Sequence, residues 1–190
     1  HVADYHDVKK TAALIKKMQE KYNIDVGRIY MQGMSMGNAM TSQFARYMGS
    51  ILAGAAGSGC PTNSKLLFDE NSQIINQSGP LDIWQSRLEL DKVPPHYREG
   101  DHETTRYNLK YWNQVNECER LPKIGICDEY NFAFYKGKKG NNVLMDVKNR
   151  DHGQTFDDAE LVWDYLFSGC YKDENGRLCH CEPRKKWCID

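Results

Sequence analysis

Apolar residues recur every three or four positions over residues 3–22, and charged residues fill the positions between them. This spacing predicts an amphipathic helix. The segment NIDVGRIYMQG follows as a turn and a short apolar strand, and helical spacing resumes after Ser35. The apolar positions of the first predicted helix are Val8, Ala12, Ile15, Met18 and Tyr22.

Further along the chain, short apolar runs alternate with helical patterns. Strands are predicted within residues 51–59 and 72–79, and two more lie within 131–149 around a Gly- and Lys-rich turn. Thr155 is a suitable N-cap for a last helix that ends before Gly169. Strands that alternate with helices predict an α/β fold with a mostly parallel sheet flanked by helices.

The chain is long enough for one domain with a substantial core, since it has 190 residues of which 40% are hydrophobic. We expect this domain to cover residues 1–169, with a charged and aromatic excursion at about 84–103 and a helix near 104–117. Residues 170–190 form a cysteine-rich C-terminal tail.

The formal net charge of −1 gives no electrostatic argument for binding nucleic acid or a membrane surface. No apolar run approaches the roughly 20 residues that a membrane-spanning helix needs. No signal peptide is visible, but the chain begins with His1 rather than Met, so we expect a chain that has been processed, trimmed or renumbered, and loss of a leader is one of these alternatives.

Seven cysteines favour structural disulfides and a secreted protein or another oxidising compartment. Because seven is odd, at least one thiol is free or pairs outside this chain. The alternative is a zinc site in the tail, although the spacing there lacks the paired C-x-x-C of structural zinc sites. The zinc ligands in that alternative are Cys179, His180, Cys181 and Cys188.

Ser35 lies between the predicted strand and helix, in the pentapeptide Gly33-Met34-Ser35-Met36-Gly37. This matches G-x-S-x-G, in which a sharp strand-to-helix turn presents a serine nucleophile. The turn brings the residues two before and two after the serine close together, and glycine has no Cβ to clash. The backbone N–H of Met36 would then stabilise an oxyanion. The alternative is a tight turn whose serine only caps the helix.

The chain order of a catalytic triad with this motif is Ser, then an acid, then His. Asp82 follows the predicted strand 72–79 and a glycine turn, and His152 follows the next strand before the last helix. His152 would take the proton of Ser35, and Asp82 would orient the imidazole. Asp91, Asp101 and Asp128 compete with Asp82 for the acid role.

Four segments resemble the polyhydroxybutyrate depolymerase and feruloyl esterase group of α/β-hydrolases. They are NIDVGRIYMQGMSMGNAMTSQFA, SGPLD, YWNQVNECERLP and VKNRDHGQTF. The resemblance spans about residues 3–168 and implies Ser35, Asp82 and His152 as the triad of a secreted serine esterase that needs no cofactor. Asn38 stands where that group often has another glycine, and the excursion could shape the substrate site through Trp84, His96 and Tyr97.

α/β-Hydrolases have several strands before the nucleophile, and a loop among them donates the second oxyanion N–H. Here Ser35 follows one helix and one strand, so we expect a partner segment that supplies the N-terminal half of the domain, from the same or a separate chain. The resemblance implies hydrolysis of polyester, feruloyl or acetyl-type esters. A serine peptidase of related fold and a catalytically inactive binding module remain alternatives.

Overall fold

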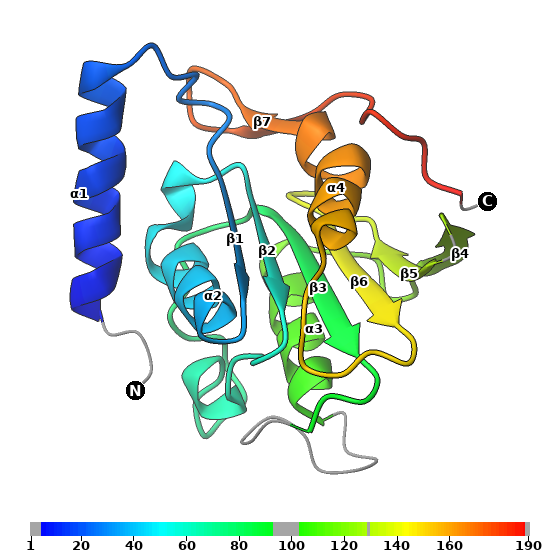
Figure 1. The fold of residues 1–190 in the computed structure, drawn as a ribbon. Coiled ribbons are helices and arrows are strands. Elements are labelled where there is room, and N and C mark those ends of the chain that lie inside the picture. The colour runs from blue at the N-terminus through cyan, green and yellow to red at the C-terminus, as the bar shows by residue number, and fades with distance from the viewer. Residues whose placement is uncertain (1–4, 93–102, 129, 189–190) are drawn as a thin grey trace.

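The computed structural model describes residues 5–92, 103–128 and 130–188. Its main sheet has six strands in the order β1-β2-β3-β6-β5-β4 (Figure 1). The first four strands in this order run parallel to their neighbours, and the last two pair antiparallel. The strands are β1 (Tyr30–Met34), β2 (Gly54–Ser58), β3 (Asp82–Leu88), β4 (Lys123–Cys127), β5 (Tyr130–Tyr135) and β6 (Asn142–Val147).

Helices cover both faces of this sheet. Successive side chains of a strand point to opposite faces, so apolar residues on both faces are buried under helices. Ile83 of β3 packs with residues from α1 (Tyr5–Lys21), α2 (Met36–Met48) and α3 (Glu103–Val115). The next residue, Trp84, packs with α4 (Phe156–Tyr165) on the other face. Figure 1 shows α3 behind the sheet and α4 in front of it. The predicted α/β fold with a mostly parallel sheet is confirmed.

Most of the predicted elements are found where the sequence pattern placed them. The helices at 3–22 and after Ser35 are α1 and α2, the helix near 104–117 is α3, and the last helix is α4. Thr155 and Asp158 form a capping box at the start of α4. No helix in the described ranges is long and apolar enough to cross a membrane.

The prediction of a strand at 72–79 is wrong. That segment is irregular, and its regular pairing is limited to an isolated bridge between Ile74 and Phe68. The strand begins instead at Asp82, within what was predicted to be a turn and an excursion. The strand β4 was not predicted, because its residues are mostly exposed and therefore lack a clear apolar pattern. Residues 93–102 of the predicted excursion lie outside the described residues.

The C-terminal tail packs on the domain. A short hairpin of β7 (Cys170–Lys172) and β8 (Leu178–His180) follows the last helix. Trp187 then inserts among aromatic rings of the core, with centroid distances of 5.0–6.1 Å. These rings belong to Trp84, Phe132, Phe134 and Tyr165.

His180 connects this hairpin to the amino end of β3. Its Nε2 lies 2.9 and 3.0 Å from the two carboxylate oxygens of Asp82, which is buried. The backbone N–H of Asn141 also donates to Asp82, at 2.7 Å. The hydrogen bond with Asp82 raises the pKa of His180 above its usual value.

This contact predicts a pH-dependent stability. Because the pKa of His180 is higher in the folded protein, the contact stabilises fully below about pH 6.5 and is lost as the pH rises through the raised value. We expect the free energy of unfolding to fall over that window, and His180→Gln to lack this part of the decline. Urea denaturation at a series of pH values measures both. Identical pH dependence in the two proteins would contradict the role of the contact.

Candidate active site

Ser35 sits at the junction of β1 and α2 in a strained backbone conformation. Its φ is 57° and its ψ is −118°, in the positive-φ half of the map that non-glycine residues rarely occupy. The backbone N–H of Ser35 donates to the carbonyl of Ser58 at the end of β2, at 2.9 Å. The strand-to-helix turn expected from the G-x-S-x-G pattern is therefore present.

The two glycines of the motif have unequal roles. A Cβ on Gly33 would lie 2.2 Å from the carbonyl oxygen of Gly37 and 2.7 Å from Thr41 Oγ1. A Cβ on Gly37 would meet no atom within 4 Å. The close approach that we expected of both glycines thus constrains Gly33 alone, which faces the backbone of the first helical turn.

His152 lies beside Ser35 and connects it to a carboxylate. Its Nε2 is 2.8 Å from Ser35 Oγ, and its Nδ1 is 2.9 Å from Asp91 Oδ2. The Asp91 side chain is 1% exposed, whereas that of His152 is 22% exposed. A serine, an imidazole and a buried carboxylate therefore form one hydrogen-bonded series at the carboxyl end of the parallel strands.

Parallel pairing of β3 with β6 brings Asp91 and His152 together, because each residue follows the end of its strand. Backbone contacts join the two following turns. Leu90 N–H donates to the Arg150 carbonyl at 2.8 Å, and Asn149 N–H donates to the Glu89 carboxylate at 2.8 Å. The latter hydrogen bond is the main reason that the pKa of Glu89 is lowered.

The loop of His152 is also anchored to α4. Arg150 forms an ion pair with Asp158, which is buried and whose carboxylate accepts the backbone N–H of Thr155 at 2.8 Å. The capping box therefore fixes both the start of α4 and the loop before it. His152 is held between two anchored segments, one on β3 and one on α4.

The prediction that Asp82 is the acid is corrected by the structure. Asp82 is the first residue of β3, and Leu88 at the other end of the strand is six positions further along the chain. At about 3.3 Å per residue this is roughly 20 Å. Its carboxylate contacts His180, and the carboxylate beside His152 belongs to Asp91.

Trp84 is almost completely buried. It is 1% exposed, it packs against Phe132 at a centroid distance of 5.2 Å, and its indole N–H donates to Ser86 Oγ. The prediction of a substrate-binding role is therefore wrong, and Trp84 is a core residue. His96 and Tyr97, named with it for the substrate site, lie outside the described residues.

Met36 begins α2 directly after Ser35. Its backbone N–H belongs to the first turn, where N–H groups have no acceptor within the helix. The N–H of Ser35 is already bonded to Ser58, so the donor nearest to the nucleophile in the chain is that of Met36. This is the position expected for an oxyanion donor.

No disulfide joins cysteines of the described residues in the structure. Burial, with a smaller contribution from Asp91, raises the pKa of Cys60. Of the four residues in the zinc alternative, His180 is engaged with Asp82, and the backbone N–H of Cys188 donates to Cys127 Sγ at 3.0 Å. Within the described part of the chain, no group of three or more His, Cys, Asp or Glu side chains could hold a metal ion.

Comparison with solved structures shows a shared fold. The structure matches the acetyl xylan esterase from Aspergillus awamori with a TM-score of 0.60 and 13% sequence identity, over 83% of this chain and 66% of that one. No protein-family model matches the chain. The fold class expected from the sequence is thus confirmed.

Two curated proteins are similar in sequence. Feruloyl esterase B of Piromyces equi is 25% identical over 178 residues, which cover 86% of this chain. The bifunctional acetylxylan esterase/xylanase XynS20E of Neocallimastix patriciarum is 22% identical over 167 residues, which cover 84% of it. These matches take up 31% and 23% of the two relatives. The expected resemblance to feruloyl esterases is confirmed, and the chain spans at most a third of these relatives.

The unequal glycines give a matched pair of variants. We expect Gly33→Ala to lower the free energy of unfolding by about 2 kcal/mol or more, because its methyl group would overlap the backbone of Gly37. Gly37→Ala adds a methyl group in open space and should change stability by less than about 1 kcal/mol. Urea denaturation followed by circular dichroism measures both, and equal destabilisation would contradict the packing described.

Proposed function

We propose that this protein is a serine hydrolase of carboxylic esters that uses Ser35, His152 and Asp91 as its triad. The observation that carries the proposal is the hydrogen-bonded series of these three side chains at the turn between β1 and α2. The named activities of its relatives favour ester bonds. Feruloyl and acetyl esters are the first substrate classes to test, and polyesters follow from the resemblance in sequence.

The geometry supports a two-step acyl transfer. His152 Nε2 accepts the hydroxyl proton as Ser35 Oγ attacks the ester carbonyl, while Asp91 accepts the Nδ1–H of His152 and stabilises the imidazolium. The tetrahedral intermediate collapses to an acyl-serine, and the proton on Nε2 passes to the leaving alcohol. His152 then removes a proton from water, which attacks the acyl group and releases the acid and Ser35.

The oxyanion would be stabilised by the N–H of Met36 at the positive end of α2. A second donor is part of the usual arrangement. We propose that it comes from a partner segment of the same hydrolase domain that pairs with β1, in the same or a separate chain. In support, β1 is an edge strand of the sheet described, and apolar side chains nearby in sequence, such as Leu14 and Val26, are exposed.

We also propose that the protein is secreted or works in another oxidising compartment. The support is the number of cysteines and the resemblance to feruloyl esterases. Intact mass spectrometry of the natural protein, with and without reduction, tests this. Conversion of cysteine pairs to disulfides is expected, and seven reduced thiols would contradict the proposal.

The function is tested by hydrolysis of p-nitrophenyl esters of increasing acyl length and of methyl ferulate. We expect the longest natural form of the protein to be active and Ser35→Ala to lose at least about 10³-fold in kcat, because the nucleophile is absent. Circular dichroism confirms that the variant is folded. Equal activity of the two proteins would refute the assignment of Ser35. Cleavage of peptides but not of esters would indicate a peptidase.

The same assay tests the partner segment. If that segment supplies the second oxyanion donor, the 190-residue chain should be slower than the longest natural form by about 10²–10³-fold. The comparison must use a small activated ester, so that lost substrate contacts contribute little. Equal values of kcat would contradict the proposed donor.

A further inference from the structure

The last residue of β2 and the residue after it together contact every member of the Ser35–His152–Asp91 series. Ser58 accepts the N–H of Ser35. The next residue, Gly59, packs directly on the other two side chains, since a Cβ there would lie 3.2 Å from His152 Cε1 and 3.4 Å from Asp91 Oδ2. The backbone of Gly59 therefore covers the edge of the imidazole and the hydrogen bond that orients it.

Gly59 and Cys60 have a backbone conformation that contacts with the surroundings must stabilise. Gly59 has a φ of 60° and Cys60 a φ of 41°, so two successive residues are left-handed. A non-glycine residue in this region is strained and persists only where the surroundings hold it. The position of Gly59 against His152 thus depends on contacts elsewhere.

Asn38, in the first turn of α2, makes those contacts. Its Nδ2 donates to the carbonyl of Gly59 and to that of Cys60, the latter at 3.3 Å. Its Oδ1 accepts from Ser42 Oγ at 3.1 Å. Asn38 is 7% exposed and lies against Gly57, where any Cβ would overlap its side chain.

We propose that Asn38 is a positioning residue of the active site, which acts on His152 through Gly59. Its amide binds the carbonyls of the two left-handed residues, Gly59 and Cys60, and so fixes the position of Gly59. Gly59 in turn fixes the orientation of the imidazole ring and shields the hydrogen bond from Nδ1 to Asp91 from water. A shielded hydrogen bond is stronger because the local dielectric is low. The inference rests on the proposed function, since it assigns a role within the same site.

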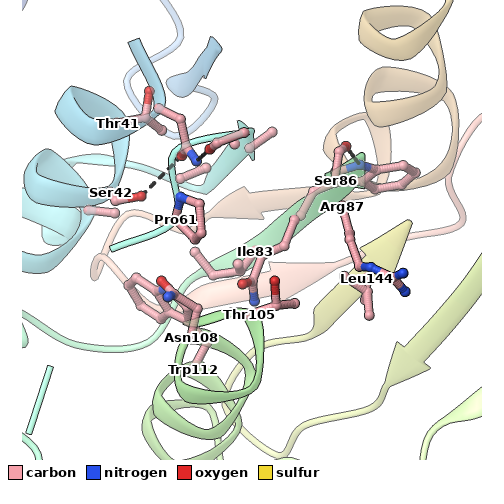
Figure 2. A pocket seen from close by; sticks show the side chains of 18 residues that line it. Thr41, Ser42, Pro61, Ile83, Ser86, Arg87, Thr105, Asn108, Trp112 and Leu144 are labelled. Atoms are coloured by element: carbon pink, nitrogen blue, oxygen red, sulfur yellow. Dashed lines mark hydrogen bonds between the residues drawn. The ribbon is translucent and has the colours of Figure 1, made fainter. Parts of the chain in front are cut away.

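A second buried asparagine provides a matched comparison. Asn108 of α3 is 5% exposed and holds the same loop further on, where its Nδ2 donates to the Thr62 carbonyl at 2.8 Å. Asn38 and Asn108 line the same small cavity of about 40 Å³, together with the residues labelled in Figure 2. The two amides are alike in burial and bonding, but only that of Asn38 bonds to residue 59.

The experiment compares Asn38→Ala, Asn108→Ala and Ser42→Ala in the longest natural form of the protein. We expect Asn38→Ala to lower kcat on p-nitrophenyl acetate by about 10–100-fold with KM changed by less than about threefold, because misplacement of a catalytic group lowers the rate of reaction. Asn108→Ala should lower the melting temperature about as much and leave kcat within about threefold. Ser42→Ala removes only the bond to Asn38 Oδ1 and should retain the kcat of the wild type.

Equal loss of kcat in Asn38→Ala and Asn108→Ala would overturn the proposal, since loosening of the loop would explain both. A folded Asn38→Ala with the kcat of the wild type would also overturn it. Gly59→Ala addresses the same contact from the other side, and its effect on kcat should not add to that of Asn38→Ala. Additive effects would mean that the two residues act separately.

A spectroscopic measurement keeps this inference separate from the function. The NMR chemical shifts of the His152 Cε1–H group report the contact with Gly59 whether or not esters are cleaved. We expect them to change in Asn38→Ala and to stay the same in Asn108→Ala. This result in a protein without esterase activity would support the positioning role and refute the proposed function. Unchanged shifts in an active enzyme with Asn38→Ala would refute the positioning role alone.

Discussion

The parallel pairing of β3 with β6 is the constraint on which the site depends. These strands are separated in sequence by α3, β4 and β5, yet their register sets Leu88 opposite Val147. The turns after both strands are therefore neighbours, and Asp91 and His152 emerge side by side. A shift in this register would move the imidazole away from its carboxylate and from Ser35. The backbone contacts of Leu90 and Glu89 with the opposite turn oppose such a shift.

Strain is concentrated at the same end of the sheet. Ser35, Gly59 and Cys60 all have positive φ. Ser35 and Gly59 lie directly after a parallel strand, and Cys60 follows Gly59. Such conformations cost of order 1–3 kcal/mol each at non-glycine residues and require support from the surroundings. The support comes from close packing of Gly33 on the first turn of α2 and from the buried amide of Asn38. Ser35 is thus held in place by α2, the helix that directly follows it.

Much of the fold could be predicted because its helices have one apolar face and the nucleophile turn has a distinctive pattern. The acid of the triad could not be predicted, because its identity depends on where β3 begins. The apolar pair Ile74-Ile75 resembles a strand, but prolonged pairing occurs only from Asp82 onward. Moving the strand by about ten residues moves the expected acid from Asp82 to Asp91. Trp84 was assigned to the substrate for the same reason, because a strand residue was taken for part of a loop.

The central claim is that Asp91, and not Asp82, orients the imidazole that activates Ser35. It is tested most directly by kcat for ester hydrolysis in Asp91→Asn and Asp82→Asn, with the folded fraction of each variant measured by circular dichroism. We expect a loss of about 10⁴-fold for Asp91→Asn, because the acid of the triad is neutralised. Asp82→Asn should keep kcat within about tenfold per folded molecule, because its carboxylate anchors the C-terminal hairpin. The reverse ranking would contradict the account.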